Sequence, residues 1–300
     1  MSARMPDRIL SIRLATAALI LSTAVLAGCS SGDGDGDGRE SRDHAQGTVP
    51  AGILPPAHVH GVEVDPADAG AVLLATHDGL FRVDDGASTR VGPVIDLMGF
   101  TVAGPNRYLA SGHPGPGVDL PQPVGLIEST DGGRTWEQLS RQGESDFHAL
   151  TVSTAGVLGY DGSLMRSSDG LEWEQLTIPA VPASLSASPD GGEMLAATAE
   201  GLLRSVDGGV SWSPSEGAPP LQVVDWATDG TAVVGVDPSG GVWSSPDGGA
   251  TWRQGPQVGP APQAVGASGS GEAARIVVVT ATGLLESTDG GRSFAVVLDR

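Results

Sequence analysis

Short apolar runs separated by turns rich in glycine and aspartate fill the chain from about residue 51 onward. Examples are the runs at 61–64, 72–76, 149–152 and 194–198. Runs of this length, bounded by turn residues and without a helical period, are typical of β-strands. The pattern of hydrophobic positions therefore predicts an all-β protein.

One motif recurs among these runs and sets their spacing. Its full form, Ser-x-Asp-Gly-Gly-x-Ser/Thr-aromatic, stands at 129–136, 205–212, 245–252 and 287–294, with a copy one residue short at 167–173 and a worn copy at 83–90. Successive copies start 38 to 46 residues apart, which is close to the period of a four-stranded propeller blade. The repeats predict a β-propeller with six blades of four antiparallel strands. A seventh blade stays open if the N-terminal part conceals another unit.

Each repeat has the same order of parts. Two apolar strands are followed by a strand that starts Gly-Leu, as at 201–204, and then by the motif, and the fourth strand is expected to begin at the Trp. Asp and Ser side chains bond to the backbone of their own turns, and glycine supplies the positive φ that such turns need. We therefore expect a structural role for the motif aspartates, which are Asp131, Asp169, Asp207, Asp247 and Asp289.

The motif resembles the Asp box, or BNR repeat, of sialidases, sortilin-type receptors and photosystem-assembly propellers. The resemblance covers about residues 58–300 and implies a propeller whose box Trp packs between neighbouring sheets. Sialidase activity in that family requires an arginine triad, a Tyr–Glu pair and an acidic Asp. Here the chain has two tyrosines, Tyr108 and Tyr160, and His58-Val59-His60 stands in place of the family's Arg-Ile-Pro segment. The sequence therefore argues against a sialidase.

The first 28 residues have the pattern of an export signal. Three arginines, Arg4, Arg8 and Arg13, precede an apolar run at 14–26 that is too short to span a bilayer comfortably. The run ends in Leu-Ala-Gly-Cys, which resembles the lipobox of bacterial lipoproteins, whose Cys is lipidated and becomes the new N-terminus. We therefore expect a signal peptide over 1–28, lipidation of Cys29, a flexible tether over 29–50 and the propeller over 51–300, at the extracytoplasmic face of the cell membrane.

Charge and cysteine content narrow the classes of function. The formal net charge is −20, whereas a nucleic-acid partner requires clustered positive charge, so we expect no nucleic acid partner. Cys29 is the single cysteine. Its lipidation would leave no free thiol, which excludes thiolate catalysis and thiolate metal ligation.

Five of the six histidines fall in the first three repeats, together with one methionine and two aspartates of interest. When the first strands are aligned on Gly61, Gly99 and Ala149, one column contains His60, Met98 and His148, and the column two residues earlier contains His58, Asp96 and Asp146. Residues two apart share one face of a strand. The two columns are therefore expected to point the same way.

The ends of the second strands carry the remaining two histidines, His77 and His113. In a propeller the first strands line the central channel and all start at one face, and the antiparallel second strands return to that face. We therefore expect His58, His60, His77, His113 and His148 at one mouth of the channel, beside a Pro- and Gly-rich insertion at 114–123 that lengthens a loop there.

Imidazole nitrogens suit copper, zinc, iron and nickel, and the thioether of Met98 adds a preference for copper. The sequence therefore favours a transition-metal site, copper first and zinc as its rival, in which Asp96 and Asp146 act as acceptors that orient the imidazoles. The same residues also fit a hydrogen-bonding cluster that holds no metal.

Two other classes of function stay open at this mouth. A glycan hydrolase would need two facing carboxylates, for which Asp96, Asp146 and Asp225 are candidates. A scaffold that docks a protein partner is the third hypothesis. The whole chain after the signal also resembles actinobacterial-type lipoproteins labelled glycosyl-hydrolase-like, through His-x-His-Gly, Ser-Gly-His-Pro-Gly and Asp-Phe-His segments, which implies fold and location but no reaction.

Overall fold

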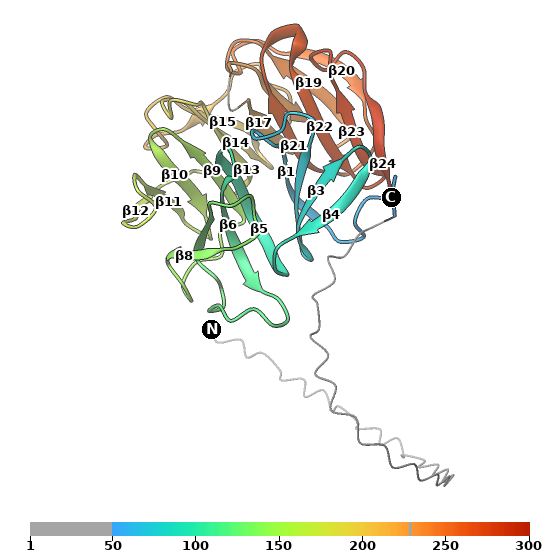
Figure 1. The fold of residues 1–300 in the computed structure, drawn as a ribbon. Helices are drawn as coiled ribbons and strands as arrows, with labels where there is room; N and C mark the ends of the chain where they lie inside the picture. The colour runs from blue at the N-terminus through green and yellow to red at the C-terminus, as the bar shows by residue number, and fades with distance from the viewer. Residues whose placement is uncertain (1–49, 228–229) are drawn as a thin grey trace, which may run out of the picture. The chain divides into compact units, whose positions relative to one another are not determined.

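The computed structural model describes residues 50–227 and 230–300, so Cys29, the signal peptide and most of the expected tether lie outside the described residues. The described chain forms six four-stranded antiparallel sheets (Figure 1). Within each sheet the strands follow one another in sequence order. The predicted all-β propeller with six blades is confirmed, and six consecutive sheets leave no seventh blade in the described chain.

The strands group into blades as follows. Blade 1 contains β1 (Val59–Val64), β2 (Val72–Thr76), β3 (Gly79–Asp84) and β4 (Ala87–Val91); blade 2 contains β5 (Ile95–Gly104), β6 (Arg107–Pro114), β7 (Leu126–Ser129) and β8 (Glu137–Ser140); blade 3 contains β9 (Ala149–Ser153), β10 (Gly156–Tyr160), β11 (Leu164–Ser167) and β12 (Glu174–Leu176). Blade 4 contains β13 (Pro182–Ala187), β14 (Met194–Thr198), β15 (Gly201–Ser205) and β16 (Ser213–Pro214); blade 5 contains β17 (Val223–Trp226), β18 (Val233–Val236), β19 (Gly241–Ser245) and β20 (Arg253–Gln257); blade 6 contains β21 (Pro262–Ser268), β22 (Arg275–Thr280), β23 (Gly283–Ser287) and β24 (Ala295–Asp299). A single 3-10 turn, η1 (Gly271–Ala273), is the one helical element of these residues, and none of their helices is long and apolar enough to cross a membrane.

The first strand of every blade contacts the first strands of its two neighbours, which closes the ring from β21 back to β1. The chain ends reinforce this closure. Ile53 forms a parallel bridge with Asp299, the amide of Leu54 donates to the Asp299 carbonyl at 2.7 Å, and the Asp299 amide donates to the Gly52 carbonyl at 2.7 Å. The segment before β1 is therefore fixed to the last strand of blade 6.

The hydrophobic core is divided into six clusters, one at each interface between blades. Between blades 1 and 2, for example, Leu73 and Leu80 pack against Leu97, and all three are about 1% exposed. The aromatic residue of each motif packs on the cluster that its blade shares with the preceding blade, as Trp136 does here; the others are Trp173, Trp212, Trp252 and Phe294. Burial of these apolar side chains drives the packing of each blade against the next.

The recurring motif folds into a turn that is closed by its own side chains. In blade 4, Ser205 Oγ accepts from the Gly209 amide at 2.9 Å, and the two oxygens of Asp207 accept from the Ser211 amide at 2.8 Å and hydroxyl at 2.6 Å. These bonds from the Ser211 side chain and amide lower the pKa of Asp207 to about 2. The same bonds recur at Asp131, Asp247 and Asp289, and a shorter version closes the turn at Asp169.

Two expectations about the repeat need correction. The fourth strand begins one residue after the aromatic residue, as Glu137 follows Trp136, because the aromatic side chain is used to reach the preceding blade. The worn copy at 83–90 is a two-residue hairpin, in which Asp84 pairs with Ala87 and Asp85 and Gly86 both have positive φ, 46° and 72°. That combination is typical of a type I′ turn, which joins two strands directly and leaves no room for the motif's longer turn.

Candidate metal centre

A β-bulge occurs at the start of the first strand in at least four blades. In β1 the pairing passes from Val59 with Thr76 to Gly61 with Ala75, which leaves His60 as the extra residue. The same irregularity leaves Met98, Ala183 and Gln263 as the extra residues of blades 2, 4 and 6. A bulge changes the direction in which a side chain points and often lies beside a functional site.

Blades 3 and 5 have the equivalent arrangement just before the strand. Ala149 pairs with Tyr160, and the preceding His148 also donates its amide to the Tyr160 carbonyl at 2.9 Å. In blade 5, the backbone amide of Gln222 donates to the Val236 carbonyl at 2.8 Å, although Val236 is the register partner of Val223. Six residues therefore stand at equivalent positions around the mouth of the channel, and blade by blade they are His60, Met98, His148, Ala183, Gln222 and Gln263.

The inner strands of all six blades line a narrow cavity of about 80 Å³ on the propeller axis. His60, Met98 and His148, which the sequence alignment placed in one column, all contribute to its wall. Met98 is half-buried on the inner strand between those of the two histidines. Its thioether therefore belongs to the same rim.

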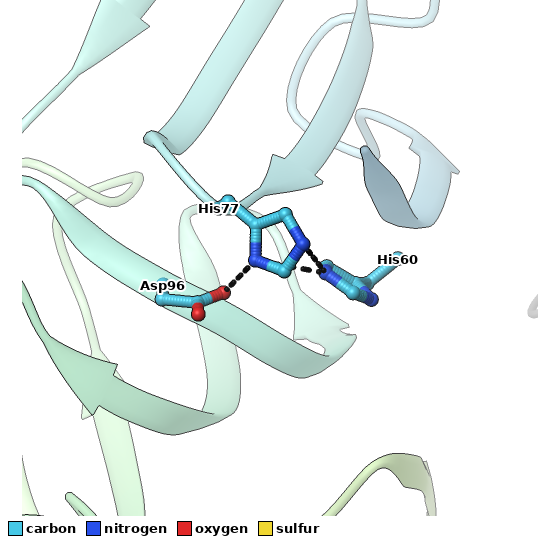
Figure 2. Close-up of side chains that lie close together, drawn as sticks. All are labelled: His60, His77 and Asp96. Atoms are coloured by element: carbon cyan, nitrogen blue, oxygen red, sulfur yellow. Dashed lines mark hydrogen bonds and ion pairs between the residues drawn. The ribbon is translucent and has the colours of Figure 1, made fainter. Parts of the chain in front are cut away.

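His60, His77 and Asp96 form a compact group at this rim (Figure 2). His60 Nε2 lies 3.3 Å from His77 Nε2 and 3.4 Å from His77 Nδ1, and His77 Nδ1 lies 2.8 Å from Asp96 Oδ1. One ligand atom from each residue lies within 4.8 Å of the other two. Three side chains of types that can ligate a metal thus meet across the boundary between blades 1 and 2. They come from β1, the end of β2 and the start of β5.

A second group continues from Asp96 into blade 3. Asp96 Oδ2 lies 3.8 Å from His113 Nδ1, the other ring nitrogen of His113 lies 3.4 Å from Asp146 Oδ2, and the same oxygen lies 2.8 Å from His148 Nε2. The side chains of Asp96 and Asp146 are 27% and 22% exposed, so both carboxylates are partly shielded from water. Histidines and aspartates therefore alternate along the rim from blade 1 to blade 3.

His58 completes the set of five histidines. Its ring centroid lies 4.8 Å from that of His60 and 6.1 Å from that of His77. Burial, followed by the charges of His77 and Arg300, lowers the pKa of His58. Burial, followed by His77 and His58, lowers the pKa of His60 to about 4. At neutral pH His60 is therefore an uncharged imidazole, the form that binds a metal ion.

Deeper in the channel, two carboxyl groups that the mouth does not use line the wall, Glu63 on β1 and Asp225 on β17. Burial raises the pKa of Asp225 to about 7, even though the Ser186 hydroxyl and the Ala267 amide donate to it. Burial and then Asp225 raise the pKa of Glu63 well above its usual value. Asp225, which the sequence analysis named as a candidate for glycan hydrolysis, thus lies below the mouth. It is hydrogen-bonded there to blades 4 and 6.

Sequence reasoning missed Glu63 altogether. The signal was present, because an acidic residue between Val62 and Val64 interrupts the apolar run of a first strand. The rule that residues two apart share a face assumes a regular strand, and the bulge at His60 breaks that regularity.

Neither tyrosine belongs to the histidine cluster. Tyr108 is 1% exposed between blades 1 and 2, and its hydroxyl donates to Asp65 Oδ1 at 3.5 Å. Burial, followed by the charge of Asp65, raises the pKa of Tyr108 to about 12. Tyr160 packs against the core between blades 3 and 4. A buried tyrosine with a raised pKa is a poor nucleophile, which argues against Tyr108 as a sialidase-type nucleophile.

No family model matches the chain, and no curated protein matches it by sequence. Among solved structures, an ancestral GH74 enzyme superposes with a TM-score of 0.53 at 14% identity over 80% of this chain and 37% of that enzyme. The GH74 enzyme of Niastella koreensis gives 0.51 at 17% identity over 79% and 44%, and YCF48 bound to D1 peptide gives 0.49 at 18% identity over 84% of each chain. The chain thus spans about two fifths of the length of these GH74 enzymes, and at such identities the likeness to them shows the β-propeller fold alone.

Proposed function

We propose that this propeller binds a transition-metal ion, with copper favoured, through the histidine cluster at one mouth of its channel. The convergence of His60, His77 and Asp96 within 4.8 Å carries the proposal. We also propose that the protein acts at the extracytoplasmic face of the membrane, where a lipid on Cys29 anchors it. Fatty-acid labelling should mark the wild type but not Cys29→Ala, and an unlabelled wild type would contradict the anchor.

The spacing of the nitrogens suits two ligands of one ion. Two imidazole nitrogens at about 2.0–2.1 Å from a tetrahedral ion lie about 3.3 Å apart, and His60 Nε2 lies 3.3 Å from His77 Nε2. Asp96 accepts from His77 Nδ1 at 2.8 Å, which fixes the ring and directs its other nitrogen toward His60.

The donor set favours copper over its rivals. Met98 shares the wall of the cavity with His60 and His148, and a thioether is a soft ligand that selects Cu(I). Zinc, bound by histidines with one position left open, is the main rival and would acidify a bound water. Cys29 is the only cysteine and precedes the propeller, so a blue-copper centre, which requires Cys, is not proposed.

A ligand that binds only the folded form raises thermal stability. Protein purified without a polyhistidine tag should therefore gain melting temperature as Cu(II) or Zn²⁺ is titrated into it. His60→Ala and His148→Ala should weaken this response, whereas Gln222→Ala, at the equivalent position of blade 5, should respond as wild type does. If neither metal stabilises the wild type, or if both histidine variants respond normally, the metal function is wrong.

Glycan hydrolysis is the second candidate, favoured by the placement of Asp96 and Asp146 at the same mouth. His113 lies between their carboxylates, 3.8 Å from Asp96 and 3.4 Å from Asp146, and a pair of carboxyl groups is the usual machinery for this reaction. A screen with oligosaccharides should then detect cleavage that Asp96→Asn and Asp146→Asn each abolish. Cleavage that survives in both variants would exclude these residues.

A further inference from the structure

A pairing of a histidine with an aspartate of the next blade occurs twice in the histidine cluster. In the first copy, His77 at the end of β2 faces Asp96, which lies at the start of the next blade's inner strand, at 2.8 Å. In the second copy, His113 near the end of β6 faces Asp146, just before β9, at 3.4 Å. Each unit thus joins the second strand of one blade to the inner strand of the next.

Each unit is completed by a histidine from the six equivalent positions at the mouth, where the bulges lie. His60 lies 3.3 Å from the His77 ring in the first unit, whereas His148 contacts the carboxylate of the second unit, 2.8 Å from Asp146. Among the described residues only the first group has its three ligand atoms within 4.8 Å of one another, so the rings of the second group must turn to share an ion. Both groups therefore contain two imidazoles and one carboxylate, a donor set that binds zinc, copper(II) or iron(II). Resting on the proposed function, we propose that the mouth holds a second transition-metal ion, bound by His113, Asp146 and His148.

The second group contains a carboxylate oxygen without a hydrogen-bond partner among the described residues. Asp146 Oδ1 is buried and has no hydrogen-bond partner among the described residues, whereas its Oδ2 is shared by His113 and His148. A buried carboxylate oxygen requires a donor or a positive charge. A cation beside Asp146 satisfies this requirement.

Asp96 connects the two sites. Its Oδ1 faces His77 of the first group, and its Oδ2 faces His113 of the second at 3.8 Å. Asp96 thus contacts a proposed ligand of each site, so the affinities of the two ions should be coupled in both directions.

The number of bound ions tests this inference. Cu(II) alone is a suitable probe because it binds imidazole and carboxylate more strongly than other divalent first-row metals do. Untagged protein is dialysed to equilibrium against low-micromolar Cu(II), and copper is measured per folded molecule. About two ions should bind to the wild type and to the control Gln222→Ala. About one should bind to the pair His113→Gln and His148→Gln, and about one to the pair His60→Gln and His77→Gln.

The outcomes separate this inference from the proposed function. One ion in the wild type, lost in the His60 and His77 variant but kept in the His113 and His148 variant, overturns the second site and leaves the metal function standing. No ion in the wild type overturns both. Glutamine is chosen because blades 5 and 6 carry Gln222 and Gln263 at the same level, and the melting temperature of each variant without metal verifies its fold.

Discussion

Blades 1 to 3 and blades 4 to 6 have the same backbone at the mouth of the channel but different chemistry. At the equivalent level, the first half presents His60, Met98 and His148, and the second half presents Ala183, Gln222 and Gln263. The bulge is therefore a property of the scaffold, because it occurs in blades with and without histidine. Side chains placed on one half of a regular ring make the candidate site.

A second contrast separates the motif turns from the histidine cluster. The motif turns bond to themselves in nearly every blade, so the scaffold is repeated around the ring. The histidines and their aspartates occur in one half only. Substitutions in the two classes should therefore have different consequences, for stability in the first and for metal affinity in the second.

The largest effect is expected when the first half is made to resemble the second. His60→Gln combined with His148→Gln gives blades 1 and 3 the residue that blades 5 and 6 carry. Loss of an outer partner of a metal ligand usually costs about 10–100-fold in affinity, so loss of proposed ligands should cost more than about 100-fold. Competition against a copper chelator measures this, and unchanged affinity would show that the two halves do not differ in function.

The motif turn should affect the scaffold alone. Asp207→Ala removes the acceptor for the Ser211 amide and hydroxyl, and it should lower the melting temperature by about 2–4 °C or more. Copper affinity per folded molecule should stay as in the wild type. Glu216→Ala, at an exposed turn position of the same blade, is the control. A large loss of copper affinity without a loss of stability would contradict the structural role of the turn.

The buried pair in the channel should make stability depend on pH. Because Asp225 has a folded-state pKa of about 7 and that of Glu63 is also raised, the folded protein keeps protons that the unfolded chain releases above about pH 4. This contribution to stability is present in acid and is lost as pH rises toward and through 7. Glu63→Gln should therefore lose less stability than the wild type does between pH 5 and pH 8.

Urea unfolding of the wild type and of Glu63→Gln at the two pH values measures this effect. The difference between the two proteins cancels the contributions that are common to both. Glu200→Gln, an exposed glutamate in the turn between β14 and β15, should show no such difference. A Glu63→Gln variant that loses stability equally at both pH values would mean that Glu63 contributes packing and no charge.

The smallest effect is expected at Met98, the one soft donor at the bulge level. Met98→Leu keeps the volume of the side chain and removes the sulfur. Affinity for Cu(I) should fall several-fold, whereas affinity for Zn²⁺ should stay unchanged, because a thioether prefers the softer ion. Equal effects on the two metals would indicate that Met98 only packs against the rim.

The fold could be predicted from the sequence because a motif with a clear physical role recurs at a regular period. Strands such as Val72–Thr76 and Met194–Thr198 lie where the apolar runs placed them. The hairpin at Asp85 and Gly86 was misread because its Asp-Gly pair imitates the motif, although two strands joined by two residues leave no space for it.

The site could be predicted only in part. Alignment of the repeats placed His60, Met98 and His148 at equivalent positions, because repeats convert sequence columns into spatial layers. The pairing of His77 with Asp96, and of His113 with Asp146, joins neighbouring blades, and no spacing within one chain segment specifies such contacts. Glu63 escaped notice because the bulge changes the alternation along β1.

X-ray absorption at the copper edge tests the central claim most directly, because it reports the atoms bound to the metal. Copper-loaded, untagged protein should show scattering from at least two imidazole rings. This scattering should be lost in a variant in which His60, His77, His113 and His148 are all replaced by Gln, and it should persist in Gln222→Ala. A wild-type spectrum with oxygen ligands and no imidazole, or unchanged imidazole scattering in the four-histidine variant, would contradict a metal centre at the histidine mouth.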